Sequence, residues 1–126
     1  MTGLIVFAHG SRVEEANEAV RRLVDTMRPQ FPAVRVEAAF LELGRPDLPD
    51  AARQLWSEGI RRITVVPYFL TPGIHLQRDL PGIIDDLERE LAGITIQVTD
   101  SLDGHPGLLQ AVVERARSAQ NGSDAV

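Results

Sequence analysis

The chain has 126 residues, a length typical of one domain that buries roughly two-thirds of its unfolded surface. A net charge of −5 argues against a nucleic-acid-binding protein or a protein bound to an anionic membrane. The absence of Cys excludes disulfides and thiolate metal sites, so a bound metal would need imidazole and oxygen ligands. The first apolar run is too short for a signal peptide or a membrane span, and we expect a cytoplasmic protein.

The first half of the sequence alternates between strand and helix patterns. A continuous apolar run over residues 4–8 predicts a strand buried on both faces of a parallel sheet. Ser11 and Glu14 have the spacing of a capping box, so we expect a helix to begin there and to end near Pro29. Residues 34–41 predict the second strand.

The alternation continues through the middle of the chain. Asp47 is the expected N-cap of a second helix, and Gly59 is expected to end it. Residues 63–67 predict the third strand, and a loop then leads to a third helix from about residue 79 to residue 91. A short fourth strand is predicted over residues 94–98.

A last helix is predicted from Pro106, with five apolar residues expected to face inward: Leu108, Leu109, Val112, Val113 and Ala116. The order βαβαβαβα predicts an α/β fold, a three-layer αβα sandwich around a four-stranded parallel sheet, similar to half of a flavodoxin-like unit. We expect one domain over residues 1–117 and a disordered tail over residues 118–126.

Three polar side chains follow the predicted strands: His9 after the first, Glu42 after the second, and His75 in the loop after the third. The carboxyl ends of parallel strands share one edge of the sheet, where open α/β sheets bind their ligands. Two imidazoles and a carboxylate suit a divalent first-row metal with open coordination positions. Taken singly, each residue also fits a structural role, so the residues alone leave both interpretations open. His105, in a Gly-His-Pro turn, is expected to be a cap or a surface residue.

Other catalytic signatures are absent or incomplete. The sequence contains no GxGxxG and no GxxxxGK, so nothing marks a dinucleotide site or a P-loop. A His-Gly pair directly after the first strand is also similar to the histidine-phosphatase signature, which would imply a phosphoryl-transfer enzyme. That chemistry needs a basic residue before the histidine, and here the preceding residue is Ala8.

Several segments together resemble the small CbiX/SirB-type sirohydrochlorin chelatases of the class II chelatase group: AHGSR, AFLELGRPDLPDA, VVPYFL, GIHLQRDLP and the late GHP. The likeness runs from about residue 4 to residue 116, with the motifs in the same order. It implies ATP-independent insertion of cobalt, iron or nickel into the tetrapyrrole sirohydrochlorin. The chain has about half the length of the two-lobed members, which implies a chelatase-like half-unit and a homodimer. The physiological metal and the pathway, cobalamin or sirohaem, stay open.

The resemblance implies that His9 and His75 hold the metal and that Glu42 is a third ligand or accepts pyrrole protons. Binding should be weak, because tight binding would oppose transfer, so we expect a metal substrate and no permanent cofactor. The substrate is a polycarboxylate, and five residues are expected to bind it or to shape its cleft: Gly10, Ser11, Arg12, Gly73 and Arg78. The alternative is a metal or tetrapyrrole carrier that uses the same site without turnover.

Overall fold

A computed structural model of the chain describes residues 1–70 and 73–121, and for His75 it describes the backbone alone. The elements are β1 (Thr2–Ala8), α1 (Glu14–Met27), a short 3-10 helix η1 (Arg28–Gln30), β2 (Val34–Phe40), α2 (Leu48–Ser57), β3 (Arg62–Tyr68), α3 (Ile74–Glu90), β4 (Thr95–Val98) and α4 (Pro106–Asn121). The strands form one parallel sheet in the order β2-β1-β3-β4. This confirms the predicted α/β fold with a four-stranded parallel sheet.

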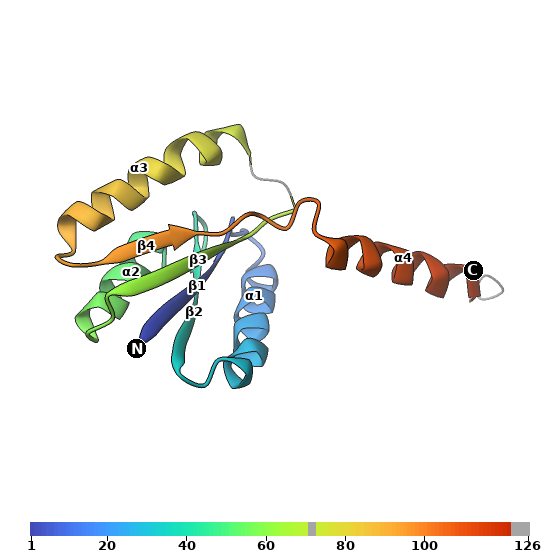
Figure 1. Cartoon of the computed structure of the whole chain (residues 1–126). Coiled ribbons are helices and arrows are strands. Elements are labelled where there is room, and N and C mark those ends of the chain that lie inside the picture. Colours follow the sequence, from blue (N-terminus) through green and yellow to red (C-terminus); the bar gives the residue numbers. More distant parts are fainter. Residues whose placement is uncertain (71–72, 122–126) are drawn as a thin grey trace.

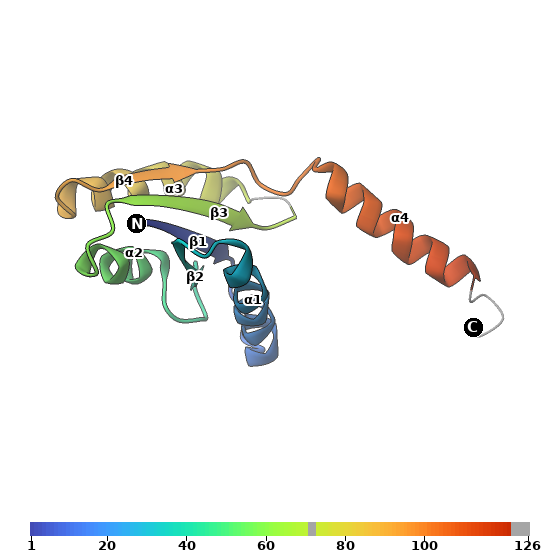
Figure 2. The same cartoon turned by 60° about the horizontal axis from the view of Figure 1, so that its bottom comes forward.

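The central strand β1 separates two hydrophobic clusters. Ile5 and Phe7 are fully buried on the face that α2 and α3 cover, whereas Leu4 and Val6 pack with α1 on the other face. Figures 1 and 2 show the resulting layers, with α2 and α3 on one side of the sheet and α1 on the other. Successive side chains of a strand point to opposite faces of the sheet. Because both faces of β1 are buried, its consecutive residues 4–8 are all apolar.

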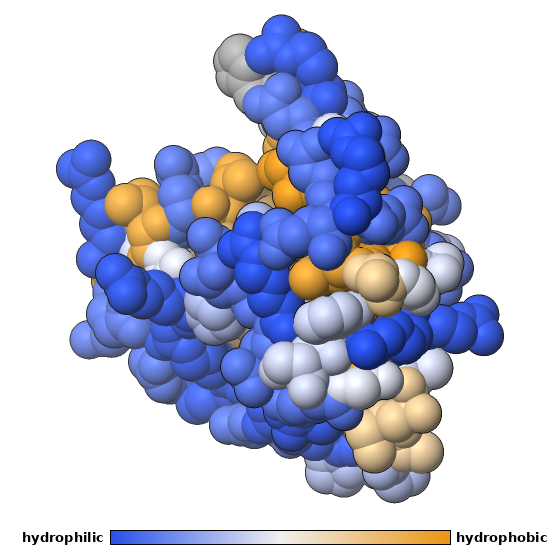
Figure 3. Space-filling view, turned by 90° about the vertical axis from the view of Figure 1, so that its left-hand side faces the viewer, coloured by the Kyte–Doolittle hydropathy of each residue, from blue (hydrophilic) through white to orange (hydrophobic). Residues whose placement is uncertain are grey.

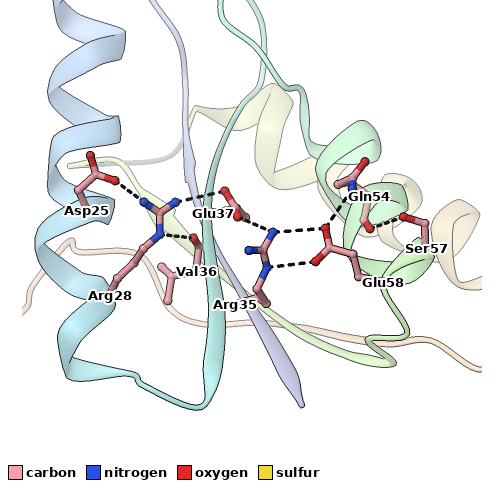
Figure 4. Close-up of polar contacts among 8 residues, drawn as sticks. All are labelled: Asp25, Arg28, Arg35, Val36, Glu37, Gln54, Ser57 and Glu58. Atoms are coloured by element: carbon pink, nitrogen blue, oxygen red, sulfur yellow. Dashed lines mark hydrogen bonds and ion pairs between the residues drawn. The ribbon is translucent and has the colours of Figure 1, made fainter.

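Charged side chains cover the outer edge of the sheet at β2 (Figure 4). Arg28 donates from Nε to the carbonyl of Val36 at 3.2 Å and pairs with Glu37 at 3.3 Å. Arg35 pairs with Glu37 at 3.0 Å and with Glu58, the C-cap residue of α2, at 3.1 Å. Charged residues on an edge strand hinder its pairing with a strand of another chain. This edge is therefore poorly suited to assembly.

The helix α1 begins differently from the prediction. Its N-cap is Val13, which has no capping side chain, so the predicted capping box is wrong. In such a box Glu14 would accept the backbone N–H of Ser11. In the structure the side chain of Asn17 accepts that N–H at 2.9 Å, and Glu14 pairs with Arg21 instead. The long-range role of Asn17 therefore replaces the local cap.

The helix α3 begins at Ile74, several residues before the predicted start near residue 79, and Pro81 lies inside it. Proline is common in the first turn of a helix, so the sequence predicted a loop before residue 79. Leu76 is buried and Leu80 packs against the same cluster, so the helical apolar spacing continues on the N-terminal side of the proline. His75 consequently lies in the first turn of α3 and not in a loop.

The helix α4 forms as predicted but does not pack on the sheet. His105 caps it by accepting the N–H of Gly107 at 2.8 Å. No residue of α4 is buried, Leu109 is 66% exposed and Val112 is 61% exposed. The expectation that these residues face inward is wrong, because the chain after β4 carries α4 away from the domain (Figures 1 and 2). Residues 118–121, expected in the tail, belong to the helix.

The side of the molecule near the amino ends of the strands is mainly hydrophilic, with hydrophobic side chains showing only in small areas (Figure 3). Over residues 1–70 and 73–121, no helix is long and apolar enough to cross a membrane.

Trp56 at the end of α2 ties that helix to its surroundings. Its half-buried ring packs against the larger core cluster, its Nε1–H donates to the carbonyl of Ala92 at 3.0 Å, and the guanidinium of Arg61 lies 4.6 Å from the ring centroid. We expect Trp56→Ala to lower the free energy of unfolding by about 2 kcal/mol, less than a fully buried Trp would lose. Urea titration measures this, and a loss under about 0.5 kcal/mol, the level of ordinary surface substitutions, would show that the ring does not stabilise α2.

Candidate functional site

His9 is the first residue past the carboxyl end of β1. Ala8 before it is buried, whereas the His9 side chain is exposed. The imidazole lies edge-on to the ring of Phe69, with 6.4 Å between the ring centroids, and Phe69 in turn lies edge-on to Phe7 of the core at 5.8 Å. The imidazole is therefore positioned from the segment after β3 while it stays open to a ligand.

Glu42 lies beside His9 because the β1–β2 pairing continues past both strands. The N–H of Leu41 donates to the carbonyl of Ala8 at 2.9 Å, and the N–H of Glu42 donates to the carbonyl of His9 at 3.1 Å. Among the described residues none bonds to the Glu42 carboxylate, which borders an open hollow of about 640 Å³. The carboxylate is thus available to a metal or a proton.

Gly10 allows this close approach of the two loops. Its φ is +93°, and a Cβ at this position would lie 1.6 Å from the carbonyl oxygen of Glu42. Leu43 also has a left-handed backbone, with φ of 57°. Such values are uncommon for a residue with a side chain and imply that the surroundings hold it in place. We call residues 9–11 and 42–43 together the rim junction.

The third predicted ligand, His75, lies outside the residues whose side chains are described. Its backbone belongs to the first turn of α3, which follows β3 at the same edge of the sheet. Within the described part of the chain, no three His, Cys, Asp or Glu side chains are grouped as metal ligands. The structure therefore brings the backbones of His9 and Glu42 together, and their shared metal, like the contribution of His75, stays a prediction.

The predicted substrate-binding residues take different positions. Ser11 is half-buried in the rim junction, and its hydroxyl accepts the N–H of Val13 at 3.0 Å. Arg12 is exposed next to it. Arg78 is exposed on α3 and pairs with Asp79 at 3.5 Å. Gly73 is the N-cap of α3 with φ of −69°, so its backbone does not require glycine.

Sequence reasoning missed two features of the site. The first is Phe69, whose ring contacts His9; its place directly after the third strand was the available signal. The second is a set of exposed large hydrophobic side chains on the segments that follow β1, β2 and β3 at the carboxyl edge: Val13, Leu43, Leu70 and Ile74. Apolar side chains beside polar ligands are the composition expected for a small-molecule site.

The family comparison decides among the chemistries that this edge permits. The family model CbiX matches residues 3–119, which include all of the sheet except Thr2, and the rim junction. The chain belongs to the CbiX family. The histidine-phosphatase interpretation is thereby set aside, in agreement with the buried alanine that precedes His9.

Two relatives of this CbiX-family chain carry named activities. The chain is 34% identical to the chloroplastic sirohydrochlorin ferrochelatase of Arabidopsis thaliana, over 90% of this chain and 50% of that protein. It is 27% identical to the sirohydrochlorin cobaltochelatase of Sulfurisphaera tokodaii, over 98% of both chains. The chain thus spans half the length of the first relative and nearly all of the second.

A solved structure has the same fold. The sirohydrochlorin chelatase SirB from Bacillus subtilis subspecies spizizenii, in complex with cobalt, matches with a TM-score of 0.82 and 25% identity. The match covers 94% of this chain and 51% of SirB.

Proposed function

We propose that this chain is a metal chelatase that inserts divalent cobalt or iron into sirohydrochlorin. The observation that carries the proposal is the rim junction, where His9 and Glu42 meet at the carboxyl edge of a CbiX-family sheet. The named activities of the Arabidopsis and Sulfurisphaera relatives support the same substrate class. The metal is a substrate in this reaction, and the proposal includes no permanent cofactor. The cytoplasmic location expected from the sequence stays a prediction.

In the proposed reaction His9 and His75 bind the metal, and Glu42 is the third ligand or the proton acceptor. Imidazole binds a first-row metal only when it is neutral. Insertion exchanges two pyrrole protons for the metal. Each imidazole that releases the metal regains a basic nitrogen, and the Glu42 carboxylate is also basic. The two pyrrole protons can therefore pass to His9, His75 or Glu42 as these side chains release the metal.

The same edge offers contacts to a flat polycarboxylate. The exposed apolar side chains of Val13, Leu43 and Ile74 suit the face of a macrocycle. Arg12 and Arg78 are exposed near this edge, and a guanidinium can bind a carboxylate through two hydrogen bonds. We assign the backbone near Gly10, Ser11 and Gly73 to the floor of the cleft.

The visible spectrum of sirohydrochlorin tests the proposal. Under anaerobic conditions, the tetrapyrrole is mixed with Co²⁺ or Fe²⁺, with and without protein at a small fraction of the substrate concentration. We expect metallation to be faster with protein and to continue for many turnovers. Rates equal to the protein-free control would refute the chelatase, and saturable binding without turnover would identify a carrier instead.

We infer that two copies of the chain associate through α4. This helix exposes an apolar face that includes Leu109 and Val112, whereas its opposite face is polar. Pairing at the edges of the sheet is disfavoured: charged side chains cover β2, and in β4 the N–H of Ile96 already donates to Glu88 at 3.0 Å. A second copy would also supply a mass similar to the half of SirB that this chain does not match.

Sedimentation of the wild-type chain should therefore give about twice its mass of 13.8 kDa. Val112→Arg places a charge on the apolar face of α4 and should shift the chain to a monomer. Ser118→Arg adds the same charge on the polar face and should leave the mass unchanged. A wild-type monomer, or equal masses for both variants, would contradict the interface on α4.

A further inference from the structure

Asn17 stands out among the described residues because it is polar and yet only 1% exposed. Its side chain makes four hydrogen bonds from the first turn of α1. Oδ1 accepts the N–H of Ser11 at 2.9 Å, and Nδ2 donates to the carbonyls of Ser11 at 3.0 Å and of Leu43 at 2.8 Å. Nδ2 also lies 3.2 Å from the carboxylate of Glu14. A buried polar group bonded in this way stabilises one arrangement of its partners.

These partners permit only one orientation of the Asn17 amide. The reversed amide would place Oδ1 against the carbonyls of Ser11 and Leu43 and against a carboxylate. Glu14 is held in its ionised form, because its hydrogen bonds to Arg21, and then to Asn17, lower its pKa below the usual value. The charge on Glu14 thus favours the donor side of the amide at this position.

The two carbonyls that Asn17 bonds belong to the two loops that carry the proposed ligands. Ser11 lies two residues after His9, and Leu43 directly follows Glu42. The left-handed backbone of Leu43 is unfavourable for leucine, and its bonded carbonyl is a contact that holds it. The buried side chain of Asn17 therefore links both loops of the rim junction to α1 through hydrogen bonds.

We propose that Asn17 is a positioning residue that sets the distance between His9 and Glu42 for a shared metal ion. Loops that follow strands are mobile unless buried contacts hold them, and a metal site needs its ligands placed within about 0.5 Å. Asn17 itself is too buried to touch a ligand in the open hollow. This inference rests on the proposed function, since the spacing matters only if both side chains act on one ion.

The test compares Asn17→Asp with Val24→Ala. The aspartate keeps an acceptor for Ser11 but loses both donors and repels the Leu43 carbonyl. We expect kcat/KM for Co²⁺ to fall about tenfold or more, since small displacements of reacting groups have large effects on rate. Amide hydrogen exchange at Ser11 and Glu42 should accelerate by a similar factor of about ten. Val24 is 1% exposed on the same helix, and its truncation should destabilise the chain while both readouts stay within about twofold of wild type.

Wild-type values for Asn17→Asp would overturn the inference, and so would equal losses in both variants, which would indicate a general effect of stability. If Asn17→Asp does not fold, amide hydrogen exchange of the wild-type chain is the test. The N–H of Ser11 donates to the buried side chain of Asn17, whereas the N–H of Val13 donates to the hydroxyl of the half-buried Ser11. The Ser11 amide should therefore exchange at least about tenfold more slowly than the Val13 amide. Equal rates would overturn the inference. If the wild-type chain showed no turnover, the proposed function would be refuted separately. Amide hydrogen exchange is measured without metal or substrate, so it tests the packing of the rim junction independently of activity.

Discussion

Replacing His9 with alanine should lower the rate of metal insertion into sirohydrochlorin by about 100-fold or more, while the fold stays intact. The loss of a group that merely orients a metal ligand costs about 10- to 100-fold, and the loss of a ligand should cost at least as much. His9 is exposed at the carboxyl edge, where its ring lies edge-on to Phe69, so stability should change little. Initial rates from the visible spectrum and the urea midpoint measure the two effects.

His75→Ala should have the same effect on the rate if both imidazoles hold the metal. The third histidine offers a matched control, because His105 caps α4 away from the sheet. His105→Ala should therefore keep the wild-type rate of insertion per active protomer. A His9→Ala or His75→Ala variant with near wild-type turnover would remove that residue from the proposed metal site.

Gly10→Ala should be the most disruptive single methyl group in the site. The added Cβ would lie 1.6 Å from the carbonyl oxygen of Glu42, and the φ of +93° is itself unfavourable for alanine. Because the contact is with backbone, the rim junction must separate. We expect the free energy of unfolding to fall by about 3 kcal/mol or more, measured by urea titration, and insertion to be lost with it.

Gly73→Ala is the matched control at the same edge of the sheet. A Cβ at Gly73 meets no atom of the described residues within 4 Å, and its φ of −69° is ordinary for alanine. Its unfolding free energy should stay within about 1 kcal/mol of wild type. Tolerance of alanine at both positions would show that the loops after β1 and β2 are not packed against each other.

The strands were predictable because burial on both faces leaves an unbroken apolar run, as at residues 4–8, and the parallel sheet followed from the alternation of strands and helices. The order of the strands within the sheet came only from the structure. Local helix signals were less reliable. The Asp47 cap formed as predicted, accepting the N–H of Asp50 at 2.8 Å. The predicted capping box did not form, because Asn17 accepts the Ser11 N–H that Glu14 would bond in such a box, and the helix begins only at Glu14. The start of α3 was predicted too late, because proline usually lies in the first turn of a helix. Here the helix continues on the N-terminal side of Pro81, where Leu76 packs into the core.

The part of the site that could be predicted consists of the residues that directly follow the strands, because the topology of a parallel sheet places them at one edge. Strand ends identified His9 and Glu42, and the structure places their backbones in contact. The contact of Phe69 with the imidazole, and the bonds from Asn17 to both loops, join residues distant in sequence. No periodicity or spacing marks such pairs. The direction of α4 was equally hidden, because an apolar helical face predicts burial without naming the surface that buries it.

Anomalous diffraction from crystals soaked with Co²⁺ would show whether His9 and His75 bind the same metal ion. We predict one cobalt ion at the carboxyl edge of the sheet, bound by a ring nitrogen of His9 and one of His75 at about 2.1 Å each, with Glu42 beside it. Cobalt bound by only one of the two imidazoles, or rings too far apart to share an ion in every subunit arrangement, would contradict it.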